Sequence, residues 1–193
     1  MRVAVSGEDG HAAVANSAAM KVAGITAATP DPEGGKIERT ANGEPTGLLI
    51  DTAAELVARL APAPTAEALD RGLQAAQDML LGVGVTTMMD MGTSTGSWAA
   101  LRRAGDGNRL KIRVIGYSDG FGPLPADIGG KPTGWLHDDR LRMAGLKLYA
   151  DGALGSRGAW LKAPYSDAPG SSGAPVTGPD KLREQSREAA RAG

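Results

Sequence analysis

A lysine inside an apolar segment is the residue with the clearest chemical potential in this sequence. Lys147 lies in the run Met143–Tyr149, whose other side chains carry no charge. Burying an ammonium group without a partner is costly, so such a lysine forms an ion pair, lies on a solvent-facing edge or has a chemical role. The run leads into a glycine-rich loop, and active sites of parallel α/β folds lie at the carboxyl ends of strands. This position favours a functional lysine, although a structural ion pair would also explain it.

The loop after this run has the composition of an anion-binding loop. Gly152, Gly155 and Gly158 surround Ser156 and Arg157. No Gly-Lys-Ser/Thr sequence follows, and no helix clearly opens after the loop, so neither of the common nucleotide-binding motifs is present. The arginine could bind a substrate carboxylate or form a surface ion pair.

Two further side chains are candidates for substrate contacts. His11 opens a predicted helix and either faces substrate or is a capping or solvated histidine. Asp90 follows an apolar run and could orient a substrate, or it could cap the next loop. His137 is expected to be a loop residue.

Composition limits the available chemistry. The 193 residues include no cysteine and only two histidines, so a zinc finger or a histidine-rich metal centre cannot be built from them alone. A net charge of -1 and seven aromatic residues disfavour a nucleic-acid partner. No apolar run approaches the ~20 residues of a membrane span, and no signal peptide is recognisable. These features predict a cytoplasmic protein with no membrane partner.

The order of predicted elements is typical of an α/β protein with parallel strands. The run 85–89 lacks polar alternation, as do strands that are buried on both faces. Asp51 is predicted to cap a short helix that extends to residue 60. The predicted helices cover 11–22, 65–82, 97–104 and 179–191; the predicted strands cover 3–6, 85–89, 111–117 and 143–149, with a hairpin over 36–50 and a polar loop over 90–96.

Four segments, in order, resemble amidohydrolase family 3, which includes enzymes similar to N-substituted formamide deformylase. They are DGHAAVANSAAMKVAGIT (9–26), PDPEGGKIERTANGEPTGLLIDTA (30–53), GVGVTTMMDMG (82–92) and GLKLYADGALGSRGAWLKAPYSDAPGSSG (145–173). The resemblance implies a partial (β/α) TIM-type barrel of the metal-dependent hydrolase superfamily. Residues 1–60 would form an inserted α+β subdomain, and residues 61–193 would supply βα units of the barrel.

The implied activity is metal-dependent hydrolysis of non-peptide C–N bonds in small-molecule amides or formamides. A divalent metal, expected to be zinc, would activate water. Lys147 would be a metal ligand as a carbamate, while His11, Asp90 and Arg157 would contact substrate. No catalytic residue is assigned.

The sequence also departs from the family pattern. The family's His-x-His pair, its later histidines and its late catalytic aspartate have no counterpart here. We therefore expect an internal fragment of the family architecture that is inactive as an isolated chain. Two alternatives remain open at the level of sequence. The chain could be a non-catalytic assembly module that docks on another chain or on a second copy of itself, or a small-anion-binding α/β module that uses the glycine-rich loop.

Overall fold

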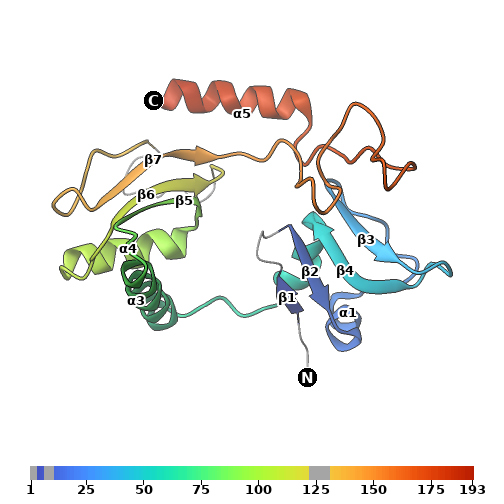
Figure 1. Ribbon diagram of the computed structural model, residues 1–193, viewed down its shortest axis with the longest axis horizontal. Coiled ribbons are helices and arrows are strands. Elements are labelled where there is room, and N and C mark those ends of the chain that lie inside the picture. The colour runs from blue at the N-terminus through green and yellow to red at the C-terminus, as the bar shows by residue number, and fades with distance from the viewer. Residues whose placement is uncertain (1–3, 7–10, 122–130) are drawn as a thin grey trace. The chain divides into compact units, whose positions relative to one another are not determined.

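The computed structural model describes residues 4–6, 11–121 and 131–193 (Figure 1). The chain divides into two compact units, Met1–Pro62 with Tyr149–Leu182 and Ala63–Leu148 with Arg183–Gly193. Compactness does not identify which segments belong to a barrel, so the assignment of 1–60 and 61–193 as domains stays a prediction. The sequence Gly-Glu-Asp-Gly at residues 7–10 favours a turn, and this segment lies outside the described residues.

An antiparallel sheet forms the framework of the first unit. Its four strands are ordered β1-β2-β4-β3, and the predicted hairpin is confirmed as the β3–β4 pair. The end of β4 continues directly into a 3₁₀ turn and a short helix. The elements are β1 (Ala4–Ser6), β2 (Ala12–Ala15), α1 (Ser17–Ala23), β3 (Gly35–Arg39), β4 (Pro45–Asp51), η1 (Thr52–Ala54) and α2 (Glu55–Ala58).

The helix predicted over 11–22 is wrong in its first half. Ala12–Ala15 form a strand that pairs with β1 on one side and β4 on the other. The helix begins after Asn16, whose side-chain oxygen accepts a hydrogen bond from the backbone N–H of Ala19 at 2.9 Å. It ends, as predicted, at Gly24, which has a φ of 71°. Pairing on two sides outweighs the weak strand preference of alanine.

Among the described residues, the main hydrophobic cluster of the first unit contains no aromatic side chain, and the buried Tyr165 lies outside that cluster. The buried members of the cluster come from three strands, the two α-helices and the turns between them. The core consists of Ala15, Ala19, Ile25, Ile37, Leu49, Ala53 and Val57. Small side chains let backbones approach closely, as at Gly47, where a Cβ atom would overlap the carbonyl oxygen of Ala15.

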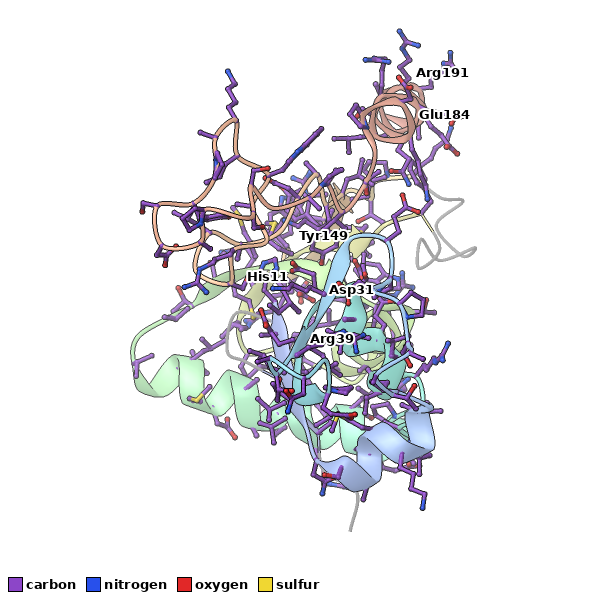
Figure 2. All side chains as sticks on the ribbon, turned by 90° about the vertical axis from the view of Figure 1, so that its right-hand side faces the viewer. His11, Asp31, Arg39, Tyr149, Glu184 and Arg191 are labelled. Atoms are coloured by element: carbon purple, nitrogen blue, oxygen red, sulfur yellow. The ribbon has the colours of Figure 1, made fainter. Side chains whose placement is uncertain are left out.

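Arg39 of β3 forms hydrogen bonds with the loop that connects α1 to β3 (Figure 2). Its guanidinium donates hydrogen bonds to the carbonyl oxygens of Ala27, Thr29 and Gly43. The Asp31 carboxylate lies 4.0 Å from the same group. One side chain therefore satisfies several loop carbonyls that have no partner in a sheet or helix.

A parallel sheet forms the framework of the second unit, in the order β5-β6-β7. Two helices, α3 and α4, lie on one face of this sheet (Figure 1). The α/β class with parallel strands is thus confirmed, and closure into a barrel stays a prediction. The elements are α3 (Ala66–Gly82), β5 (Thr87–Thr93), α4 (Thr95–Asp106), β6 (Arg113–Asp119) and β7 (Leu141–Lys147), followed by α5 (Pro179–Ala192).

The helix-covered face of the parallel sheet holds the second core. Trp98 and Leu101 of α4 pack with Leu141 and Met143 of β7. Gln77 of α3 is buried but satisfied, because its side chain accepts a hydrogen bond from Lys111 N at 2.7 Å and donates one to the carbonyl oxygen of Arg109 at 3.3 Å. No helix of the described residues is long and apolar enough to cross a membrane.

The prediction that the 85–89 strand is buried on both faces is wrong for the described structure. Met88 packs against the helix-covered core, whereas Met89 and Met91 are 60% and 45% exposed. The polar loop predicted from residue 90 is also wrong, because β5 continues to Thr93. Met89 and Met91 lie on the face of the sheet opposite the helices, which we call the open face. A sequence pattern cannot distinguish these exposed methionines from buried ones.

Two methionines of the same sheet provide a matched test of this arrangement. Met143→Ala removes a side chain that is 0% exposed, and we expect a loss of about 2–5 kcal/mol in unfolding free energy. Met89→Ala, on the open face, should change the unfolding free energy by less than about 0.5 kcal/mol. Urea unfolding followed by tryptophan fluorescence measures both, with Trp98 reporting on this core. Equal losses of unfolding free energy in the two variants would contradict this arrangement, because they would show that Met89 is buried as well.

Candidate active-site elements

The carboxyl edge of the parallel sheet brings Lys147 beside an aspartate. Lys147 is the last residue of β7 and is paired in register with Asp119, the last residue of β6. The backbone N–H of Gly120 donates to the carbonyl oxygen of Lys147 at 3.0 Å, which fixes the turn after β6 to the end of β7. The strand predicted over 143–149 runs instead from Leu141 to Lys147, so the lysine is the last residue of the strand.

A β-bulge decides which face of the sheet carries Lys147. Gly116 pairs with Met143, but the next residue, Tyr117, pairs with Gly145, so Ala144 is an extra residue in β7. In a regular strand, Lys147 would share the helix-covered face with Met143, four residues away. The extra residue reverses this alternation.

The bulge therefore places Lys147 on the open face. A Cβ atom at Gly145 would lie 3.5 Å from the ring of Tyr117, which confirms that these two positions share a face. Two steps further along the strand, Lys147 and Asp119 lie on that same face. An amine and a carboxylate thus share the open face at the carboxyl edge.

Asp90 occupies a different position from the one that the sequence indicates. It does not end its strand, and its register partner is Gly116, on the helix-covered face. Its carboxylate accepts a hydrogen bond from Thr93 Oγ1 at 2.8 Å. The sheet therefore separates the face of Asp90 from that of Lys147. A substrate contact for Asp90 stays a prediction that this geometry does not favour.

His11 is paired with an aspartate that the sequence assigned to another role. His11 Nδ1 lies 2.8 Å from Asp51 Oδ1, and the backbone N–H of Asp51 donates to the carbonyl oxygen of His11 at 2.9 Å. Figure 2 shows His11 where the antiparallel sheet meets the loop segment of the same unit. The prediction that Asp51 caps a helix is wrong, because its side chain makes no capping hydrogen bond. Nothing in the local sequence marks a pair that is 40 residues apart.

The glycine-rich loop encloses the Asp51 carboxylate. A Cβ atom at Gly152 would lie 2.5 Å from Asp51 Oδ2, and one at Gly158 would overlap that oxygen. The loop closes on itself through a hydrogen bond from Gly152 N to the carbonyl oxygen of Gly158 at 3.3 Å. The anion that these glycines accommodate is therefore part of the chain, which disfavours the small-anion-binding alternative.

Arg157 lies beside a hollow of about 400 Å³ that Asp51 also lines. Its guanidinium forms two hydrogen bonds with the Asp167 carboxylate, from Nε at 3.2 Å and from Nη2 at 2.8 Å. These bonds lower the pKa of Asp167 and raise that of Arg157. The surface ion pair is confirmed, and a substrate role for Arg157 stays a prediction.

The described residues do not by themselves fit a metal centre. Across 4–6, 11–121 and 131–193, no group of three or more His, Cys, Asp or Glu side chains could hold a metal ion. His137 lies in a turn, as expected, with its Nε2 atom 3.9 Å from Asp106. Lys147 and Asp119, which share the open face of the described parallel sheet, could therefore supply only part of a metal site.

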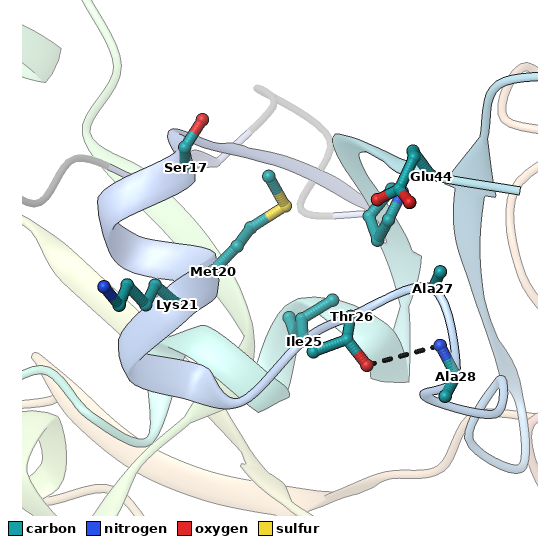
Figure 3. A pocket seen from close by; sticks show the side chains of 9 residues that line it. Ser17, Met20, Lys21, Ile25, Thr26, Ala27, Ala28 and Glu44 are labelled. Carbon is teal, nitrogen blue, oxygen red and sulfur yellow. Dashed lines mark hydrogen bonds between the residues drawn. The ribbon is translucent and has the colours of Figure 1, made fainter. Parts of the chain in front are cut away.

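A larger hollow of about 640 Å³ lies between α1 and the β3–β4 turn (Figure 3). Lys21 and Glu44 are its charged lining residues, and Figure 3 shows Lys21 pointing away from Glu44. The drawn hydrogen bond, from Ala28 N to Thr26 Oγ1 at 3.2 Å, shapes the loop wall. The hollow brings no reactive groups together.

Comparison with known proteins relates the whole chain to one family. A model of the Amidohydrolase family matches residues 2–193. The putative amidohydrolase YtcJ of Bacillus subtilis is 33% identical over 186 residues, which cover 93% of this chain and 34% of that protein. The N-substituted formamide deformylase of Arthrobacter pascens is 38% identical over 108 residues, covering 54% of this chain and 20% of that enzyme.

A solved structure supports the same relationship. The crystal structure of an uncharacterized metal-dependent hydrolase from Pyrococcus horikoshii superposes with a TM-score of 0.70 at 27% identity. It covers 99% of this chain, and this chain covers 37% of it. The chain thus spans about a third of the length of the Bacillus relative and little more of the Pyrococcus structure.

The ion pair of Arg157 gives a direct test of its environment. Arg157→Gln removes the charged donor, so the pKa of Asp167 should rise toward the ordinary aspartate value. Carboxyl ¹³C NMR during a pH titration measures this change. Arg103→Gln is the matched control, because it should raise the pKa of its own partner, Asp70, and leave Asp167 unchanged. An unaltered Asp167 titration in Arg157→Gln would contradict the pairing.

Proposed function

Because the chain belongs to the amidohydrolase family, we propose that it forms part of a hydrolase acting on C–N bonds other than peptide bonds. The proposed substrates are small-molecule amides or formamides. Similarity to the N-substituted formamide deformylase supports the bond type, and similarity to the metal-dependent hydrolase supports a metal centre. We further propose that β5, β6 and β7 belong to a (β/α) barrel and that the metal is zinc.

The observation that carries this proposal is the bulge that places Lys147 beside Asp119 on the open face. In a barrel of parallel strands, the carboxyl ends of the strands bear the active site. A lysine at this point can attack CO₂ through its neutral amine, forming an N–C bond and releasing one proton to solvent. The product is a carbamate, whose two oxygens suit divalent cations.

Lys147 and Asp119 supply too few ligands for a metal pair, so the centre needs ligands outside the described residues. A bound divalent metal lowers the pKa of its water and provides hydroxide near neutral pH. The contribution of this chain is then to position the lysine. Its β7 strand holds the amine at the strand end, and the adjacent Asp119 adds a second oxygen donor on the same face.

Carbamate formation tests the assigned role of Lys147. We expect the purified chain, incubated with ¹³C-bicarbonate and Zn²⁺, to show a carbamate carbon resonance. Lys147→Arg should abolish the resonance, because a guanidinium stays protonated near neutral pH and does not act as a nucleophilic amine. Lys162→Arg, at an exposed lysine of the first unit, is the matched control and should leave it unchanged. A resonance that survives in Lys147→Arg, or none in the unaltered chain, would refute the assignment.

Turnover tests whether further ligands are needed. The chain alone should hydrolyse N-methylformamide no faster than buffer with the same Zn²⁺, since its described residues form no metal cluster. Formate release and metal content by mass spectrometry are the measurements. Stoichiometric tight zinc together with formate release would show that these residues are sufficient, contrary to our expectation.

A further inference from the structure

A short extended segment before β7 places a tryptophan on the open face of the parallel sheet. Leu136 forms an antiparallel bridge with Leu141, with backbone hydrogen bonds in both directions at 2.8 and 3.1 Å. The side chains of Leu136 and Leu141 both belong to the core on the helix-covered face. Because side chains alternate along extended chains, the preceding residue, Trp135, lies on the open face opposite Arg142.

Two arginine side chains lie against the ring of Trp135. The Cζ atoms of Arg113 and Arg142 are 5.6 and 5.4 Å from the ring centroid. Arg113 precedes Val114, and Arg142 follows Leu141; both of these neighbours are buried in the helix-covered core, so the arginines belong to the open face. A guanidinium that stacks on an aromatic ring keeps its N–H groups at its edge, where they can meet an acceptor. We call these three side chains the arginine platform.

The platform holds two positive charges without a carboxylate. Arg113 Nε donates to the carbonyl oxygen of Asp139 at 2.8 Å. Arg142 Nε is buried and has no hydrogen-bond partner, whereas the terminal nitrogens of Arg142 keep contact with solvent. Within the part of the chain that the structure describes, neither guanidinium forms an ion pair. Unfilled donors on a cation attract an oxyanion, because charge-assisted hydrogen bonds are the strong ones.

An apolar row begins beside the platform and crosses the sheet. Arg142 of β7 is paired in register with Ile115 of β6, which is paired with Met89 of β5. These three residues share the open face, where the side chain of Ile115 is half-buried and that of Met89 is 60% exposed. Neighbouring strands lie about 4.8 Å apart, so the row extends about 10 Å from the arginine to the methionine. We call Ile115 and Met89 the apolar row.

We infer that the arginine platform and the apolar row together bind a small carboxylate that carries an apolar chain. The planar guanidinium matches the two oxygens of a carboxylate, and the chain covers the exposed side chains of the row. All of these residues belong to the second compact unit. The site begins at the amino edge of the sheet, at the opposite end of the strands from Lys147, and does not depend on the proposed hydrolytic function.

NMR titration with hexanoate tests the site. We expect hexanoate to shift the indole ¹⁵N–H signal of Trp135 and the methyl ¹³C signal of Met89, which Trp135→Phe and Met89→Leu assign. Hexanamide has nearly the same shape without the charge and should bind at least about tenfold more weakly. Acetate, which lacks most of the chain, should lose up to about fourfold in affinity for each methylene that is no longer buried.

Variants separate the two parts of the site. Arg142→Gln should weaken hexanoate binding at least about tenfold and remove the preference over hexanamide. Arg187→Gln removes the same charge from an exposed position of α5 and should leave binding unchanged. Met89→Ala should weaken hexanoate binding and leave that of acetate as it was. Backbone amide spectra show that each variant is folded.

Three results would overturn the inference. Hexanoate that leaves the Trp135 and Met89 signals of the folded chain unmoved would exclude the site. Unchanged hexanoate affinity in a folded Arg142→Gln would exclude the role of the arginine. Acetate or inorganic phosphate that binds as tightly as hexanoate would show a general anion site in place of one for apolar carboxylates. A failed carbamate test at Lys147 would refute the proposed function and leave these results standing.

Discussion

A carboxylate packed between glycines and bonded to an imidazole joins the segments of the first compact unit. Asp51 ends β4, His11 precedes β2, and Gly152 and Gly158 belong to a loop about a hundred residues further along the chain. A poorly exposed carboxylate is costly unless it is hydrogen-bonded. The His11 ring meets this requirement, and the missing side chains of the two glycines allow the approach. Because the main hydrophobic cluster described in this unit consists of small and aliphatic side chains, close backbone contacts contribute strongly to its packing.

A different constraint governs the second unit. In a sheet, side chains alternate between faces, so one additional residue changes the face of everything that follows. Ala144 is that residue in β7, and it moves Lys147 from the helix-covered face to the face of Tyr117 and Asp119. A comparable irregularity between Asp90 and Thr93 in β5 keeps both side chains on the covered face, where they bond to each other. Two small departures from regular pairing thus decide which polar groups reach the open face.

Features that depend on neighbours in the sequence could be predicted. The end of α1 at Gly24, the start of α3 after Thr65 and the β3–β4 hairpin follow from local backbone preferences. The β2 strand could not be predicted, because alanine has a weak strand preference and the strand depends on pairing with β1 and β4. The bulge at Ala144 and the role of Asp51 depend on pairing with residues far along the chain. The family resemblance, in contrast, depends on ordered segments and survives these local errors.

The loop from Gly152 to Gly158 shows why an anion-binding pattern in a sequence does not identify the anion. Glycines and an arginine can accommodate a carboxylate whether it belongs to a ligand or to the protein itself. Here the glycines contact Asp51, and Arg157 binds Asp167. With its arginine already paired, the loop offers little attraction to an anionic substrate. An uncharged amide needs no cation; it needs an acceptor for its N–H and a donor or metal for its carbonyl oxygen. The pairing of Arg157 with Asp167 is therefore consistent with the uncharged amide substrate that we propose.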